Sequence, residues 1–371
     1  MKIAFVIFAF IFTLVMGAYV SLRGWQVLQS SQNMRITYLV ANIILFSLMI
    51  IGLMSRGALA PSFGKIITFV GYSYMIVMIY LLLSFVLVDI VRLLNLAFGF
   101  ASLAMKTFRM WSFFLSLAVI AIAMIIGNYK FNHPAIVEMN IQIEKPLQNK
   151  TLRIVAVSDI HLGVSIEKTR LKKYVDLINA QNPDIVLMVG DVTDNVVKPL
   201  IDQNMAQELR EIKADLGVYS VSGNHEYYSE RLHMTEDYLK TAGIVTLCDT
   251  SVLIDNSFYI VGRDDRTNSK RANLSQIVTG LDSSKMKILL DHQPYHLNEA
   301  RENGIDLQIS GHTHDGQFFP GNLFVKRMYE LAHGYMKKGK THYYVSSGLG
   351  LWGPQYRIGT QSEIVVFNLK Y

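Results

Sequence analysis

Hydrophobic residues follow two different patterns along the chain, and the change between them comes near residue 131. Before that point, uncharged apolar runs occupy residues 3–22, 36–55, 66–88 and 110–129. Each run is long enough for a helix across about 30 Å of hydrocarbon, which needs about 20 residues. Four such runs joined by short basic loops are not typical of the core of a soluble domain. The pattern predicts a multi-pass α-helical membrane domain over residues 1–131.

The loops between these runs carry basic residues, which indicate a topology. One side of the membrane would hold Arg23, Arg35, Arg92, Lys106 and Arg109, and the other side Lys2, Arg56, Lys65 and Lys130. Because short cytoplasmic loops carry the excess of Lys and Arg, the first group is placed in the cytoplasm. The protein is then a multi-pass cell-membrane protein whose C-terminal domain lies on the outer side.

Two details of this part carry further expectations. Asp89, the one acid before residue 132, precedes Arg92 by three positions, which predicts a local ion pair at the membrane interface. Residues 93–105 are apolar but too few to span a membrane. They are expected to form either an interfacial segment or the tail of the third helix.

From residue 132 to residue 371 the pattern changes to short β-rich runs between polar helical segments. Strands are predicted at residues 136–144, 152–158, 184–189, 217–222, 258–261, 287–290, 307–310, 342–345 and 363–369, and helices at residues 167–180 and 202–213. Strands that alternate with helices predict an α/β sheet covered by helices. Because the later strands lack long helices between them, a mixed sheet or a second sheet is expected.

Composition and charge support this division. The chain is 51% hydrophobic and 17% charged, which excludes a disordered or fibrous protein. The net charge of +6 separates into +8 before residue 132 and −2 after it. The bases are spread thinly between apolar runs, so no nucleic-acid binding is expected. The single cysteine, Cys248, excludes an intrachain disulfide.

Aspartate, asparagine or histidine residues follow five of the predicted strands, close to the point where each strand ends. They are Asp159 and His161, then Asp191, then Asn224 and His225, then His292, and finally His312 and His314. Ligand sites of α/β sheets lie at the carboxyl ends of the strands. We therefore expect these side chains to converge on one crevice.

Seven of these side chains are donors that suit metal ions. Carboxylate, amide and imidazole groups without thiolates favour Mn, Fe or Zn over a structural zinc site. Seven donors exceed what one such ion uses, whereas two divalent metal ions that share a carboxylate would use them all. Such a pair would polarise a phosphoryl group and generate hydroxide at neutral pH. The sequence predicts metal-assisted hydrolysis.

The order D-x-H, G-D, G-N-H-E, H, G-H-x-H resembles the calcineurin-like metallophosphoesterases over residues 152–369. The resemblance implies an α/β domain in which mixed sheets form a β-sandwich flanked by helices. It also implies roles for single residues: Asp159, His161 and His314 as ligands of the first metal, Asn224, His292 and His312 as ligands of the second, and Asp191 as the bridge.

The same resemblance gives His225 a catalytic role without ligation: it contacts the phosphate and protonates the leaving oxygen, with Glu226 or Asp194 as its partner. Asp291, directly before His292, departs from the small or polar residue of many relatives. The run from Ser346 to Gly350 with the following Trp-Gly-Pro resembles the closing loop of the exported and membrane-anchored branch of the family.

Three functions stay open on the sequence alone. The first is a membrane-bound phosphoesterase acting on a lipid or lipid-linked envelope phosphate, with aromatic residues such as Phe318, Phe319 and Trp352 beside the site. The second is a membrane-anchored nucleotide or phosphoprotein phosphohydrolase. The third is a catalytically silent membrane scaffold. The expected partners are the lipid bilayer and a phosphorylated lipid or other phosphate ester.

Overall fold

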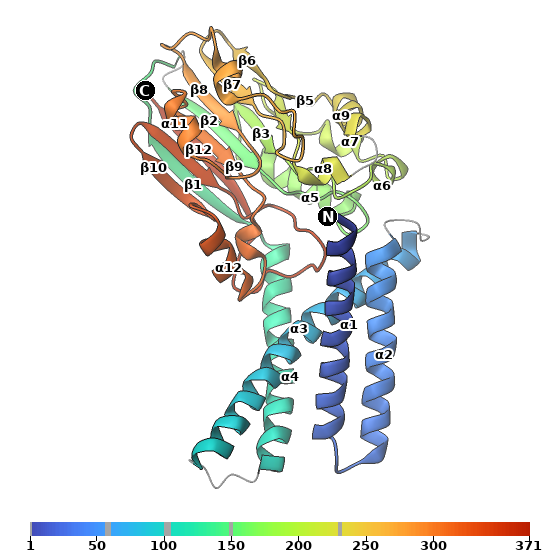
Figure 1. Cartoon of the computed structure of the whole chain (residues 1–371). Coiled ribbons are helices and arrows are strands. Elements are labelled where there is room, and N and C mark those ends of the chain that lie inside the picture. The colour runs from blue at the N-terminus through green and yellow to red at the C-terminus, as the bar shows by residue number, and fades with distance from the viewer. Residues whose placement is uncertain (1, 56–60, 100–104, 148–150, 229–231) are drawn as a thin grey trace. The chain divides into compact units, whose positions relative to one another are not determined.

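The computed structural model describes residues 2–55, 61–99, 105–147, 151–228 and 232–371 (Figure 1). The chain divides into two compact units, Met1–Ile126 and Gly127–Tyr371, and each is described by itself. The division falls inside a helix, a few residues before the change of hydrophobic pattern near residue 131.

The first unit is helical. Its described helices are α1 (Lys2–Val27), α2 (Gln32–Ser55), α3 (Pro61–Phe98) and the greater part of α4 (Met105–Asn132). All four are long and apolar enough to cross a membrane, as the sequence predicts. Residues 93–98 form the tail of α3, whereas residues 100–104 and Arg56 lie outside the described residues.

Asp89 has closer partners than the one predicted for it. The local pair exists, with Arg92 Nη1 at 3.7 Å from Asp89 Oδ1. The other carboxylate oxygen binds the guanidinium of Arg23 and accepts a hydrogen bond of 2.7 Å from the Tyr19 hydroxyl. Asp89 therefore ties α3 to α1 as well as to its own helical turn.

The second unit contains two mixed sheets among its described residues. One has the order β1 (Ala135–Gln142), β12 (Glu363–Lys370), β2 (Thr151–Val157), β3 (Ile185–Val189), β4 (Val218–Val221) and β5 (Val245–Thr246). The other has the order β10 (Gly334–Lys338), β11 (Thr341–Val345), β9 (Leu307–Ser310), β8 (Met286–Leu290), β7 (Phe258–Gly262) and β6 (Thr250–Ile254).

The two sheets pack face to face. Buried residues such as Ile154 and Phe367 of the first sheet meet Ile288 and Ile309 of the second in one apolar cluster. The outer face of the first sheet is covered by α5 (Lys168–Asn179), α7 (Ala206–Leu209) and α9 (Leu232–Thr241). The second is covered by α10 (Leu274–Val278) and α11 (Asn298–Glu302). The expected sandwich of mixed sheets flanked by helices is confirmed.

One predicted element is wrong. Residues 202–213 do not form a single helix, because α6 (Lys198–Asp202) ends where the prediction begins and α7 covers only Ala206–Leu209. Asn204 between them adopts the left-handed conformation with φ of 51°, which a continuous right-handed helix does not allow.

The last residues of α4 belong to the second unit. Phe131 is fully buried in the core between the first sheet and its helices, and the Arg170 guanidinium lies 4.3 Å from the centre of its ring. Residues 127–132 also bind the loop before β12, where the Arg357 N–H donates to the carbonyl oxygen of Gly127 at 2.9 Å. A candidate membrane span thus ends as a part of the sandwich domain.

Candidate metal centre

The predicted site residues come together at one edge of the sandwich. Strands β2, β3 and β4 are parallel neighbours in one sheet, and β8 and β9 are parallel neighbours in the other. The residues that follow these strands include all seven predicted ligands. Among the described residues, the side chains of six of them, all but Asn224, form overlapping clusters of potential metal ligands. Convergence at the strand ends is therefore what the structure shows.

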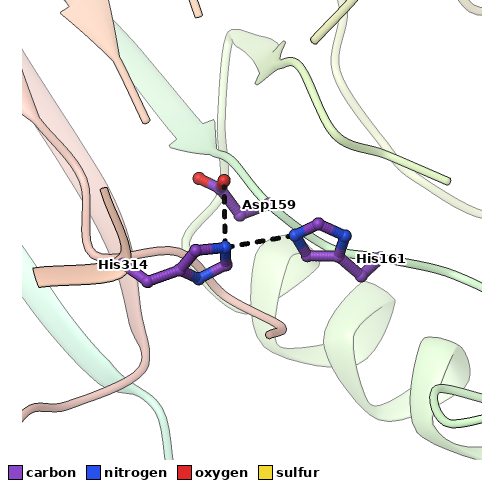
Figure 2. A group of neighbouring side chains, drawn as sticks. All are labelled: Asp159, His161 and His314. Atoms are coloured by element: carbon purple, nitrogen blue, oxygen red, sulfur yellow. Dashed lines mark hydrogen bonds and ion pairs between the residues drawn. The ribbon is translucent and has the colours of Figure 1, made fainter. Parts of the chain in front are cut away.

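Asp159, His161 and His314 form the first cluster (Figure 2). His314 Nε2 lies 3.2 Å from His161 Nε2 and 3.4 Å from Asp159 Oδ1. Figure 2 shows the three side chains pointing toward one another, Asp159 and His161 from the loop after β2 and His314 from a second loop. Two imidazoles and a carboxylate at this spacing can share one cation.

Asp191, His292 and His312 form a second cluster. Asp191 Oδ2 lies 3.2 Å from His292 Nε2 and 3.8 Å from His161 Nε2, so this carboxylate faces both clusters. This is the position that a bridging carboxylate requires. Asn224 begins α8 (Asn224–Tyr228), and its buried Oδ1 has no hydrogen-bond partner among the described residues.

The donor set fits divalent cations. Asn224 Oδ1 and His314 Nδ1 are buried without a hydrogen-bond partner among the described residues. Burial holds the pKa of His161 and His314 well below the usual value, which keeps both imidazoles neutral. A buried acceptor without a partner costs free energy unless a donor or a cation binds it, and the neutral imidazole is the form that binds a metal ion.

The backbone of this site is unusual. Five of the predicted ligands have left-handed φ values between 50° and 71°, namely Asp159, His161, Asp191, His312 and His314. Glycines at two of the turns allow close approach: a Cβ on Gly223 would overlap Asp191 Oδ1, and one on Gly311 would overlap Asp159 Oδ2. The turns therefore tolerate few other residues.

His225 is not among the predicted ligands, although it forms a third group of potential metal ligands with His161 and Asp191. Its ring centre is 4.5 Å from that of His161, and its Nδ1 donates to the Asp194 carbonyl oxygen at 2.5 Å. The Asp194 carboxylate is 3.4 Å from the same nitrogen. Burial lowers the pKa of His225, but Asp194 and Asp191 outweigh it and raise the value to about 9. Nδ1 is thus occupied, and Nε2 is the nitrogen left to exchange a proton.

Of the two expected partners of His225, the structure supports Asp194, because Asp194 contacts His225 Nδ1. Glu226 has other partners. The Glu226 carboxylate instead accepts hydrogen bonds from the backbone N–H groups of Asp191, Thr193 and Gly223 at 2.7–3.0 Å. It holds the turn after β3 against the turn after β4, and so fixes Asp191.

Asp291 points away from the ligands. Its oxygens lie 3.2 Å from Arg263 Nη1 and 3.2 Å from Arg271 Nη1, all three side chains being largely buried. His292 donates from Nδ1 to the Val189 carbonyl oxygen at 2.8 Å, which leaves Nε2 toward Asp191. The acid before this histidine is therefore a member of a separate ion-pair group.

Arg357 is fully buried and was not among the residues predicted from the sequence. Its guanidinium donates to the carbonyl oxygens of His314, Gly348 and Gly350 at 2.6–3.0 Å, and to Ser362 Oγ at 3.2 Å. It joins the closing loop to the turn that carries His314. The sequence held no signal for this role, because the acceptors are backbone carbonyls.

The aromatic residues expected beside the site divide into two groups. The Trp352 ring centre is 6.3 Å from that of His225, and Gln317 Nε2 donates to the Trp352 carbonyl oxygen at 2.9 Å. Phe318 is half-buried, whereas Phe319 is exposed on the surface. Trp352 is thus the one of the three with a described contact to a predicted catalytic side chain.

Comparisons with known proteins agree with this geometry. A family model described as calcineurin-like phosphoesterase matches residues 152–316. An uncharacterized metallophosphoesterase of Campylobacter jejuni is 36% identical over 266 residues, which cover 70% of this chain and 70% of that protein. An uncharacterized metallophosphoesterase of Aquifex aeolicus is 32% identical over 260 residues, covering 67% of this chain and 98% of that protein.

A third similar protein is a transmembrane protein with metallophosphoesterase domain from Danio rerio. It is 33% identical over 253 residues, which cover 64% of this chain and 57% of that protein. The matched part therefore spans a little over half of that relative.

Proposed function

Because the chain belongs to the calcineurin-like phosphoesterase family and is thereby a metal-dependent phosphoesterase, we propose that it hydrolyses a lipid or lipid-linked phosphate ester while bound to the cell membrane. The observation that carries the chemistry is the convergence of six of the seven predicted ligands in overlapping clusters, with the Asp191 carboxylate facing both. When bound, two divalent ions would polarise a phosphoryl group and activate a water molecule.

The chain's own residues divide this work. Asp159, His161 and His314 would hold one ion, Asn224, His292 and His312 the other, and Asp191 both. His225 would contact the phosphate and pass a proton from Nε2 to the leaving oxygen, since its Nδ1 is held by Asp194.

Substitutions at Asp191 and His225 test these roles. Asp191→Ala should remove metal and activity together, because its carboxylate faces both clusters. His225→Ala should keep the metal and lower kcat by about 10²–10⁴-fold, the range of general acid catalysis. Metal content by elemental analysis and turnover of a soluble phosphate ester measure both. Wild-type turnover by metal-loaded Asp191→Ala would contradict the two-metal mechanism.

The lipid substrate is supported by the end of α4. Residues 127–132 are at once the end of a candidate membrane span and a part of the catalytic unit, so little chain separates the bilayer from the metal ligands. An enzyme held in this way meets lipid headgroups at high effective concentration. A soluble substrate gains nothing from the arrangement.

The comparison that tests the substrate class uses the full chain in liposomes and a chain that begins at residue 127. We expect the shortened chain to keep kcat/KM on a soluble ester and to lose it on a lipid phosphate. Equal retention or equal loss on both substrates would favour an anchored enzyme for nucleotides or phosphoproteins. Metal binding without turnover of any phosphate ester would favour a silent scaffold.

A further inference from the structure

Helix α12 (Gly321–Met328) presents large apolar side chains to the surface of the catalytic unit. Leu323 is 57% exposed, and Phe324 and Met328 are each 67% exposed. None of the eight residues of α12 is buried. An apolar face of this size on so short a helix is unusual for a surface that meets only water.

The charge of α12 selects among possible partners. Lys326 and Arg327 are exposed in the same two turns, and the helix contains no acidic residue. Exposed aromatic and aliphatic side chains interleaved with cations are typical of helices that lie in a membrane interface. The cations would meet lipid phosphates while the apolar side chains enter the acyl boundary.

Contacts within the catalytic unit connect α12 to the end of α4. The Phe319 N–H, just before α12, donates to the Ile358 carbonyl oxygen at 2.7 Å. The preceding residue of the same loop, Arg357, donates its N–H to the carbonyl oxygen of Gly127 near the end of α4. Since α4 is a candidate membrane span, the surface beside its end is where a bilayer would be met.

Helix α12 is also close in sequence to the predicted ligand His314. Helix η1 (His314–Gly316) begins at His314, and α12 follows it after four residues. The Gln317 carbonyl oxygen between them accepts a hydrogen bond of 2.7 Å from Thr360 Oγ1. A surface that rests on lipid at α12 therefore lies a few residues from one edge of the metal centre.

We propose that α12 is an interfacial helix that inserts Leu323, Phe324 and Met328 into the lipid surface, with Lys326 and Arg327 against anionic headgroups. The helix would then rest the catalytic unit on the bilayer. The inference concerns a contact with the membrane and goes beyond the proposed function, because it holds for a soluble or a lipid substrate.

The test places a fluorescent probe on α12 in the full chain. In a Cys248→Ser background, which removes the single cysteine, Phe324→Cys or Met328→Cys is labelled with an environment-sensitive dye. The matched control is Leu253→Cys on β6, an exposed apolar position at the opposite edge of the second sheet from β10. Each variant is placed in vesicles whose lipids carry a quencher at a known depth on the acyl chain.

We expect the dyes at residues 324 and 328 to be quenched at a depth of roughly 5–10 Å, and the dye at residue 253 to be unaffected. Lys326→Glu with Arg327→Glu should weaken the quenching in vesicles that contain phosphatidylglycerol and leave it unchanged in phosphatidylcholine. Turnover of a soluble ester in detergent should equal that of the background.

Absence of quenching at both positions overturns the proposal, and so does loss of soluble-ester turnover at both, which would place α12 in the catalytic machinery. Cross-links between copies through residue 324 without quenching would assign the face to a second copy instead. Quenching without lipid-phosphate hydrolysis would leave the interfacial helix standing and reject only the lipid substrate.

Discussion

Arg357 is a buried cation whose hydrogen bonds go to the carbonyl oxygens of His314, Gly348 and Gly350 and to a serine hydroxyl. Burial lowers its pKa to about 10, so it stays protonated at neutral pH. Several donors in one rigid plane let it hold the closing loop against the turn that carries His314. It is a positioning residue for His314 and not a ligand.

Replacing Arg357 should therefore disturb both folding and metal binding. Arg357→Met leaves three buried carbonyl oxygens without this donor, and we expect a loss of about 3 kcal/mol in the free energy of unfolding. Arg357→Lys keeps the charge and a part of the bonding, so its loss should be smaller. Thermal unfolding and elemental analysis measure the two effects. A methionine variant with wild-type stability and metal content would show that the residue has no such role.

His333 provides a pH-dependent contact, and its Nδ1 lies 3.9 Å from the carboxylate of Asp315, the residue after His314. Its Nε2 lies 3.2 Å from Glu363 Oε2. Burial lowers the pKa of His333, but the carboxylates of Glu363 and Asp315 raise it above its usual value. The stabilisation is complete below the unfolded pKa of about 6.5 and is lost as pH rises through the higher folded value.

The prediction is that His333→Gln is less stable than the wild type at pH 5–6 and equal to it in alkaline solution. The effect should be modest, because the side chain is 34% exposed and solvent weakens the pair. The free energy of unfolding of both proteins, measured from pH 5 to alkaline pH, tests this prediction. A stability difference that does not change with pH would mean that the ion pair contributes nothing.

The residues expected to bind metal or transfer protons could be predicted from the sequence, because they follow predicted strands directly. Asp191 and His225 could be found in this way. The bonds of Glu226 and Arg357 could not, because both side chains bind backbone groups of turns distant in sequence. Backbone N–H and carbonyl partners have no signature in residue type.

At the scale of elements, nine of the twelve described strands were predicted within about two residues, because burial makes them short and rich in apolar residues. Strands β5, β6 and β10, all at sheet edges, were not predicted. The interruption between α6 and α7 was not predicted either, since it depends on one left-handed residue, Asn204. The pattern also gave no indication that the end of α4 fills a core. An apolar helix end looks the same whether lipid or protein covers it.

Phe131 tests that last element. Because its side chain is fully buried in the catalytic unit, Phe131→Ala should cost about 3–5 kcal/mol in the stability of that unit. A chain that begins at residue 133 lacks this ring and should be less stable than one that begins at residue 127. Tyr129→Ala, on the exposed side of the same turn, is the control and should change stability little in detergent. Equal effects of the two alanines would place Phe131 outside the core.

At the scale of the whole molecule, the four candidate spans and the loop charges lead us to propose that the catalytic unit lies outside the cytoplasm. A fluorescent reporter that matures only in the cytoplasm, fused after Tyr371, should then be dark. The matched control is the same reporter fused after residue 31, between α1 and α2. It should be fluorescent, because three further spans separate the two points. Fluorescence after Tyr371 would reverse the proposed topology.

The left-handed backbone of the predicted ligands also limits how this centre can evolve. Aspartate, asparagine and histidine adopt φ values near 50° more readily than other residues with side chains. A glutamate or cysteine at Asp159 or His312 would bring a new donor together with backbone strain. Exchange of one donor type for another therefore changes the metal coordination and also strains the backbone. Selection for a different metal should preserve the turns and alter instead the residues behind them, such as Glu226 and Asp194.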